Sequence, residues 1–181
     1  MKKLTGIALI FILFLSVQAC KDRKGKNFNK TPKDTTTTAI ADTSDFIYKG
    51  AEAGNAEVQL SQLALKNSKN DKIKAYANMI ILDHTDAGNE FAILADDQKI
   101  KMPDSLNSAH GQLKASLAKK IGLEFDKEYI QAMVTDHEKA IALFKTGAAD
   151  KNAKISDFAA KMLPKLKAHL KEANTICAEL K

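Results

Sequence analysis

Three histidines and one glutamate have the side-chain types and the spacing to bind a metal ion together. His84, His137 and His169 each lie among apolar residues that recur with helical spacing, and Glu57 lies among alanines and a glycine. Such spacing places each of the four side chains on the apolar face of its own helix. Three imidazoles and a carboxylate suit zinc, copper(II) or iron(II). We therefore treat these four residues as candidate metal ligands.

Two of the histidines belong to a motif that occurs twice. Both copies share five residue types at the same spacing, which indicates a duplication or a shared site: Tyr76-x6-Asp83-His84-x2-Ala87-x3-Phe91 and Tyr129-x6-Asp136-His137-x2-Ala140-x3-Phe144. In each copy the aspartate points about 100° away from the histidine around the helix axis. We expect Asp83 and Asp136 to accept hydrogen bonds from ring N–H groups on neighbouring helices, which would fix the histidine tautomers.

A metal-free interpretation fits the same residues. Buried histidines that are neutral and paired with carboxylates form a polar network that sets the register of the helices. We expect His110 to be a surface residue and Cys177 to be a small core residue. Tyr76 and Tyr129 are expected to pack in the core with hydrated hydroxyl groups.

Four long helices and one short helix must position these side chains. From residue 45 onward no apolar/polar alternation of strand length occurs, and Ala, Leu, Lys and Glu dominate. The expected helices span about 43–67, 71–98, 104–119, 124–149 and 153–179, with Gly122 closing the short one. The long connection after the second helix favours an all-α, ferritin-like four-helix bundle with a crossover that carries the short helix. A simple antiparallel bundle with an added helix is the alternative.

The four candidate ligands are predicted to lie at one level of the bundle. Glu57, His84 and His137 stand within about one turn of their helix midpoints, and His169 stands ~5 Å beyond its own. Similar distances from the midpoints mean similar heights, so the four groups can converge in the core.

The N-terminal residues differ in character from the rest of the chain. Residues 1–19 combine two lysines with a short apolar run, which is typical of a secretory signal peptide. The segment Val17-Gln18-Ala19-Cys20 resembles the lipobox of bacterial lipoproteins, which implies cleavage before Cys20 and acylation of that cysteine with chains such as palmitate. An ordinary signal peptide with a chance cysteine is the alternative.

Lipid attachment at Cys20 implies an anchored protein of the bacterial cell envelope, and we expect the outer membrane, on its periplasmic or surface face. Residues 20–43 are polar and threonine-rich, so we expect a disordered tether before the domain at 44–181. An acylated Cys20 would also leave Cys177 without a disulfide partner.

The net charge of +6 is concentrated in the N-terminal segments. Residues 1–19 carry +2, residues 20–44 carry +3 and residues 45–181 carry +1. The last segment contains no arginine, the residue that clamps phosphates and reads bases. We therefore expect no nucleic-acid partner, and we expect the basic tether to lie near anionic lipid head groups.

Five short segments are similar to the signatures of a known family: Ala53-Gly54-Asn55-Ala56-Glu57-Val58, Asp83-His84, Phe125-Asp126-x2-Tyr129, Asp136-His137 and Leu163-Pro164-x4-His169-Leu170. The chain resembles DUF4142, an uncharacterised bacterial family of exported proteins that are often called predicted outer membrane proteins. The resemblance covers about residues 45–181. It implies a ferritin-like four-helix fold, an envelope location and the same four candidate ligands, without an established activity.

Ferroxidase chemistry is not indicated. A di-iron site needs Glu-x-x-His on two helices, whereas the residues three before His84, His137 and His169 are isoleucine, valine and leucine. No nucleophile motif, glycine-rich phosphate loop or Cys-x-x-Cys is present. We expect a lipoprotein that serves metal or small-ligand binding, or stress protection, rather than an enzyme. The alternatives are a metal-free structural or interaction lipoprotein and a metal-dependent oxidase or hydrolase.

Overall fold

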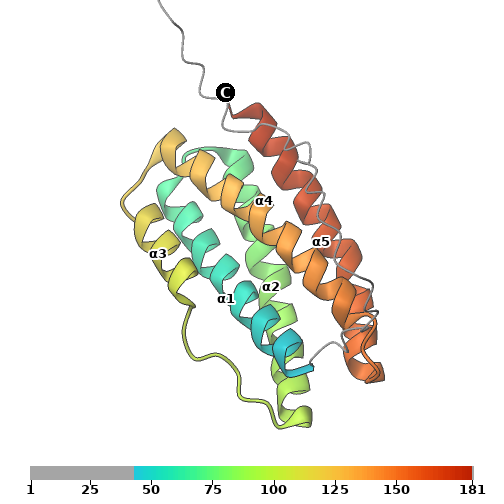
Figure 1. Ribbon diagram of the computed structural model, residues 1–181. Coiled ribbons are helices and arrows are strands. Elements are labelled where there is room, and N and C mark those ends of the chain that lie inside the picture. Colours follow the sequence, from blue (N-terminus) through green and yellow to red (C-terminus); the bar gives the residue numbers. More distant parts are fainter. Residues whose placement is uncertain (1–42, 181) are drawn as a thin grey trace, which may run out of the picture.

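The computed structural model describes residues 43–180, and within that range it contains five α-helices and no strand. Four long helices pack side by side, and a short helix lies outside them (Figure 1). In chain order the helices are α1 (Thr43–Asn67), α2 (Asp71–Gln98), α3 (Ser108–Leu117), α4 (Gly122–Gly147) and α5 (Ala153–Glu179). The predicted all-α class is confirmed, and the long helices begin and end within two residues of the predicted positions.

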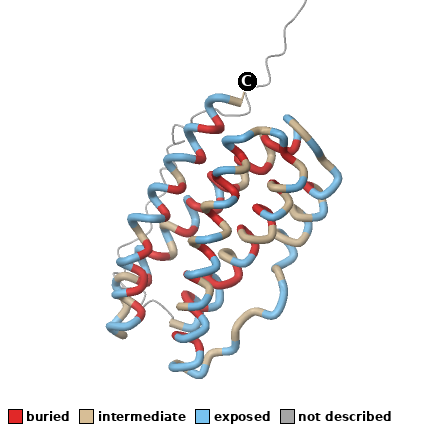
Figure 2. Tube along the Cα trace, turned by 180° about the vertical axis from the view of Figure 1, so that it is seen from behind, coloured by how far each residue is buried: buried red, intermediate tan, exposed pale blue. Residues whose placement is uncertain are grey.

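The long helices form two antiparallel pairs. α1 packs against α2 and α4, and α5 packs against the same two helices on their other sides. The connection that contains α3 runs back along the outside, so α2 and α4 point in the same direction (Figure 1). This order places one face of each long helix toward a shared core, where the buried residues gather (Figure 2).

Asparagine side chains begin three of the five helices. Asn70, Asn107 and Asn152 each accept a hydrogen bond from a backbone N–H of the following turn, which satisfies donors that the helix itself cannot. The cap at Asn107 explains why α3 starts at Ser108 rather than near residue 104. The prediction that Gly122 closes α3 is wrong. Gly122 instead begins α4 with a φ of +60°, a conformation that favours glycine.

The core contains an aromatic cluster at each end of the bundle. At one end four phenylalanine rings pack edge to face or tilted, with centroids of Phe91 and Phe158 4.8 Å apart. At the other end Tyr76 and Tyr129 pack against aliphatic residues. Both rings are buried in the core, as predicted, and the Tyr129 hydroxyl has Ser61 as its partner at 2.8 Å, where a hydrated hydroxyl was predicted.

Cys177 lies in the core at the tyrosine end with 8% of its surface exposed. It is disulfide-bonded, which corrects the expectation that it lacks a disulfide partner. The other cysteine of the chain, Cys20, lies outside the described residues, as do the predicted signal peptide and tether. Because one sulfur cannot hold both a lipid thioether and a disulfide, acylation of Cys20 and a disulfide to Cys20 exclude each other.

No helix within residues 43–180 has both the length and the apolar character that crossing a membrane requires.

Candidate metal centre

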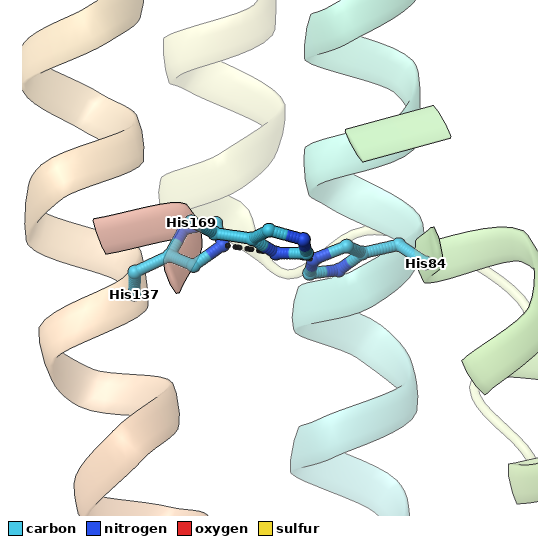
Figure 3. A group of neighbouring side chains, drawn as sticks. All are labelled: His84, His137 and His169. Carbon is cyan, nitrogen blue, oxygen red and sulfur yellow. Dashed lines mark hydrogen bonds between the residues drawn. The ribbon is translucent and has the colours of Figure 1, made fainter. Parts of the chain in front are cut away.

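Three histidines from three helices meet between the two aromatic clusters. His84 on α2, His137 on α4 and His169 on α5 are each no more than 5% exposed, and their rings point toward one another (Figure 3). His84 Nε2 lies 3.4 Å and His137 Nε2 lies 3.3 Å from His169 Nδ1. One nitrogen from each ring lies within 4.8 Å of the other two. The predicted convergence of the three histidines at one level is therefore what the structure shows.

The second nitrogen of each ring contacts an acceptor on the outer side of the site. His84 Nδ1 lies 2.8 Å from Glu57 Oε2, and His137 Nδ1 lies 3.0 Å from Glu57 Oε1. His137 Nδ1 is also 2.9 Å from the carbonyl oxygen of Met133. His169 Nε2 lies 2.9 Å from Asp83 Oδ2. Acceptors therefore hold all three outward nitrogens.

This arrangement determines the tautomer of each neutral ring. A neutral imidazole carries one proton, and an acceptor draws that proton to the nitrogen that it contacts. The outward nitrogens therefore carry the protons, and the three inward nitrogens present lone pairs to one another. Lone pairs at this distance repel, so a positive charge between them, either a metal ion or a further proton, stabilises the arrangement.

Glu57 does not lie where the inward nitrogens converge. Its carboxylate contacts the outer nitrogens of His84 and His137, so it orients two rings instead of adding a fourth ligand atom. Only 2% of Glu57 is exposed, and Oε1 has no well-directed hydrogen bond among the described residues because the His137 proton is directed at Met133. A buried carboxylate needs a compensating positive charge nearby.

Burial and the opposite charges shift the pKa values in this site. Burial acts to raise the pKa of Glu57, but the adjacent His84 and His137 rings outweigh it and hold that pKa well below its usual range. Burial acts to lower the pKa of His137, and the Glu57 carboxylate outweighs it and raises that pKa. For His169, burial and the two neighbouring rings lower the pKa to about 4 despite Asp83. Glu57 is therefore ionised and His169 is neutral at neutral pH.

The two motif aspartates contact different histidines. Asp83 accepts a hydrogen bond from His169 on the neighbouring α5, as expected from its position, and it also pairs with Lys165 at 2.9 Å. Asp136 does not contact any of the three core rings. Its Oδ2 lies 3.6 Å from His110 Nε2 on α3, and its Oδ1 lies 2.9 Å from Lys139. Asp136 was expected to pair with a ring N–H of a neighbouring helix. The ring that it contacts is on α3 and is not one of the three core histidines, because this side of α4 faces the connection that contains α3.

His110 and Glu52 form a polar cluster that the sequence prediction missed. His110 was expected at the surface, yet only 13% of its side chain is exposed, and its Nδ1 lies 2.9 Å from Glu52 Oε1. Glu52 also accepts hydrogen bonds from the backbone and side chain of Asn107, which ties the start of α3 to α1. The one signal for this contact is Asn107, a residue typical of helix N-caps that lies three residues before His110.

The fold and the site together define a helical bundle whose buried core carries a cluster of three histidines. The chain belongs to the family described as domain of unknown function DUF4142, whose family model matches residues 28–176. The resemblance inferred from the sequence motifs is thereby confirmed. No curated protein matches the sequence.

Two solved structures share the fold. One is a DUF305 fragment from Deinococcus radiodurans, with a TM-score of 0.68 and 10% identity, covering 76% of this chain and 95% of that chain. The other is a DUF305 protein from Streptomyces coelicolor, with a TM-score of 0.66 and 13% identity, covering 78% of this chain and 96% of that one. At these identities the likeness concerns the fold alone.

Proposed function

We propose that this protein binds one transition-metal ion, zinc, copper or iron, through His84 Nε2, His137 Nε2 and His169 Nδ1. The observation that carries the proposal is the spacing of the inward nitrogens, 3.4 and 3.3 Å for the two pairs that include His169. Metal–nitrogen bonds of 2.0–2.1 Å in a tetrahedral site place two ligand nitrogens about 3.3–3.4 Å apart. Three imidazoles then fill three positions and leave the fourth open.

The surrounding acceptors support this assignment. Histidine ligands of metals almost always donate the other ring N–H to a carboxylate, a carbonyl or water, which fixes the tautomer and makes the ligand more basic. Glu57, Asp83 and the Met133 carbonyl stand in those positions. A dication would also compensate the buried charge of Glu57. When bound, such an ion supplies a Lewis-acidic centre with an open position.

A metal-free network is the second candidate, and the raised pKa of His137 favours it. A charged His137 ring would donate from Nε2 to His169 Nδ1 across 3.3 Å and would compensate Glu57. In that case the histidines set the register of the helices and hold no ion. His169 Nδ1 can accept only one such bond, so one inward nitrogen of the three would remain without a partner.

Metal titration of the purified protein separates the two candidates. We expect one ion per chain and, at a free-ion concentration of about 100 Kd, a stabilisation of roughly 2.7 kcal/mol, or about 10 °C in melting temperature. His84→Asn should remove stoichiometric binding. His110→Asn changes the one other histidine in the chain and should retain it. No stabilisation by any of the three metals, or equal binding by both variants, would favour the metal-free network.

The proposed setting is an envelope lipoprotein with a ferritin-like bundle. The antiparallel pairs and the long connection with α3 support the ferritin-like classification. The order of the predicted signal segment and Cys20 supports acylation, whereas the disulfide of Cys177 opposes it, because Cys20 is the one other cysteine in the sequence. Mass spectrometry of the N-terminal peptide from the native host tests it. Acyl chains on Cys20 are expected, and a Cys20–Cys177 disulfide would contradict the lipid anchor. In the cell envelope, we propose that the protein binds metal and thereby protects the envelope from metal or oxidative stress.

A further inference from the structure

An apolar pocket lies directly beside the three-histidine centre. Glu57 and His84 form part of its wall, and Ala140 and Leu166, which also line it, lie one turn from His137 and His169. Its volume is about 30 Å³, whereas a single water needs a space of at least about 10–15 Å³. The space therefore suits a molecule of two or three heavy atoms. Phe91 and Phe144 of the phenylalanine cluster line it on one side, and small residues form much of the remaining wall: Gly50, Ala53, Gly54, Ala87, Gly88 and Ala140.

The position of this pocket follows from helix register. Moving one turn from the site toward the phenylalanine end leads from Glu57 to Ala53, from His84 to Ala87 and from His137 to Ala140. Three of the four helices therefore place an alanine directly beside the centre on that side.

The opposite side of the centre is filled. One turn toward the tyrosine end lie Leu60, Ile80 and Met133, all with 0% of their surface exposed. These large side chains, together with Ala173 from α5, pack against the centre on that side. The pocket on the phenylalanine side is therefore the space that we assign to an open coordination position.

Two half-buried glycines, Gly54 on α1 and Gly88 on α2, line the pocket. Because they are partly exposed small residues of its wall, we take its mouth to lie between these two helices. A Cβ added at Gly88 would meet no heavy atom within 4 Å, and one added at Gly54 would lie 3.7 Å from His84 Nδ1. Neither glycine is required by a close approach of other atoms, so a Cβ can be added at either position without a clash.

We propose that this pocket admits a small uncharged molecule, of the size and polarity of dioxygen or nitric oxide, to the open fourth position of the metal centre. Apolar walls disfavour a hydrated ion, which would lose its water on entry. The inference rests on the proposed metal site for the final binding step. The pocket itself exists independently of the ion.

Xenon tests the pocket without the metal. Xenon binds in apolar cavities, and in the metal-free protein it should shift the methyl NMR signals of Ala87 and Ala140. In Gly88→Leu those shifts should disappear. Gly111→Leu is the matched control, since Gly111 is also helical, also meets nothing within 4 Å of an added Cβ, and lies on α3 away from the pocket. Gly54→Ala is a milder second variant that should weaken the shifts.

Nitric oxide tests access to the centre. Added to protein loaded with cobalt(II), it should change the visible absorption spectrum, and Gly88→Leu should weaken that binding at least about tenfold relative to Gly111→Leu. If the protein takes up neither cobalt nor zinc, copper or iron, the metal site is overturned. The xenon experiment still tests the pocket in that case, because it uses metal-free protein. Absence of xenon shifts in the wild-type protein, or equal nitric oxide binding by both leucine variants of metal-loaded protein, would overturn the access proposal.

Discussion

Replacement of Glu57 by glutamine should weaken metal binding although Glu57 itself binds no ion. The change keeps the size of the side chain and removes one of its two acceptor oxygens. Glu57 accepts from His84 Nδ1 at 2.8 Å and lies 3.0 Å from His137 Nδ1. A glutamine amide places an oxygen on one ring and an NH2 group on the other. Whichever ring faces the NH2 group, the site loses the buried negative charge that a bound cation would compensate. Where that ring is His84, its proton must also move inward, which converts one ligand lone pair into an N–H.

The magnitude follows from the loss of one hydrogen bond to a charged acceptor, about 1.5–3 kcal/mol. Since about 1.4 kcal/mol corresponds to a factor of ten, the affinity should fall roughly 10–100-fold. The same range is typical when an outer partner of a metal-bound histidine is changed. Replacement of a direct ligand would instead remove stoichiometric binding altogether.

Glu52→Gln provides the matched control for this measurement. Glu52 lies on the same helix, is 5% exposed against 2% for Glu57, and contacts His110 instead of the core rings. Competition titration with a chelating indicator dye measures the Kd of both variants and of the wild-type protein. We expect Glu52→Gln to stay within about threefold of the wild type. A Glu57→Gln protein with wild-type affinity, or an equal loss in both variants, would refute the orienting role.

Three further predictions concern the surroundings of the centre. The carboxylates of Asp136 and Glu52 raise the pKa of His110 to about 9 against the opposing effect of burial. The resulting stability is fully present below pH 6.5, the unfolded value, and is lost as the pH rises through 9. Urea unfolding should therefore show His110→Asn to be destabilised by about 1–2 kcal/mol at pH 6 and by much less at pH 10. Gly147→Ala should cost about 1–3 kcal/mol in the same assay, because the added Cβ would lie 2.5 Å from a buried phenylalanine ring. Tyr129→Phe should cost about 1–2 kcal/mol through loss of its buried serine partner, whereas Tyr76→Phe should be nearly neutral because its hydroxyl has no partner among the described residues. Calorimetric melting compares the two tyrosine variants.

The sequence was sufficient to predict the helices and the height of the site. Helical spacing of apolar residues located the four long helices, since it reports which face of each helix is buried. Counting residues from the helix midpoints placed the three histidines at one level, because every α-helix rises by the same 1.5 Å per residue. Neither inference required knowledge of which helices are neighbours.

Contacts that depend on neighbours and rotamers could not be predicted in this way. The carboxylate of Glu57 has the right height for a ligand, and the rotamers of His84 and His137 decide that it meets their outer nitrogens instead. His110 lies in a connection without hydrophobic periodicity, so nothing in the apolar pattern reported that α3 docks on α1 and α4.

The repeated Asp-His motif acquires different partners in its two copies because its two helices have different neighbours. In both copies the histidine points into the core and the aspartate pairs with a lysine and with a histidine of another helix, His169 for Asp83 and His110 for Asp136. The helix beside Asp83 is α5, which also faces the core, so its histidine adds a third inward nitrogen. The helix near Asp136 is α3, which lies outside the four long helices, and Glu52 holds its histidine there. A motif that contributes two equivalent histidines thus yields three inward nitrogens instead of four, and the metal ion that we propose would have its open position where the fourth is absent, beside the pocket.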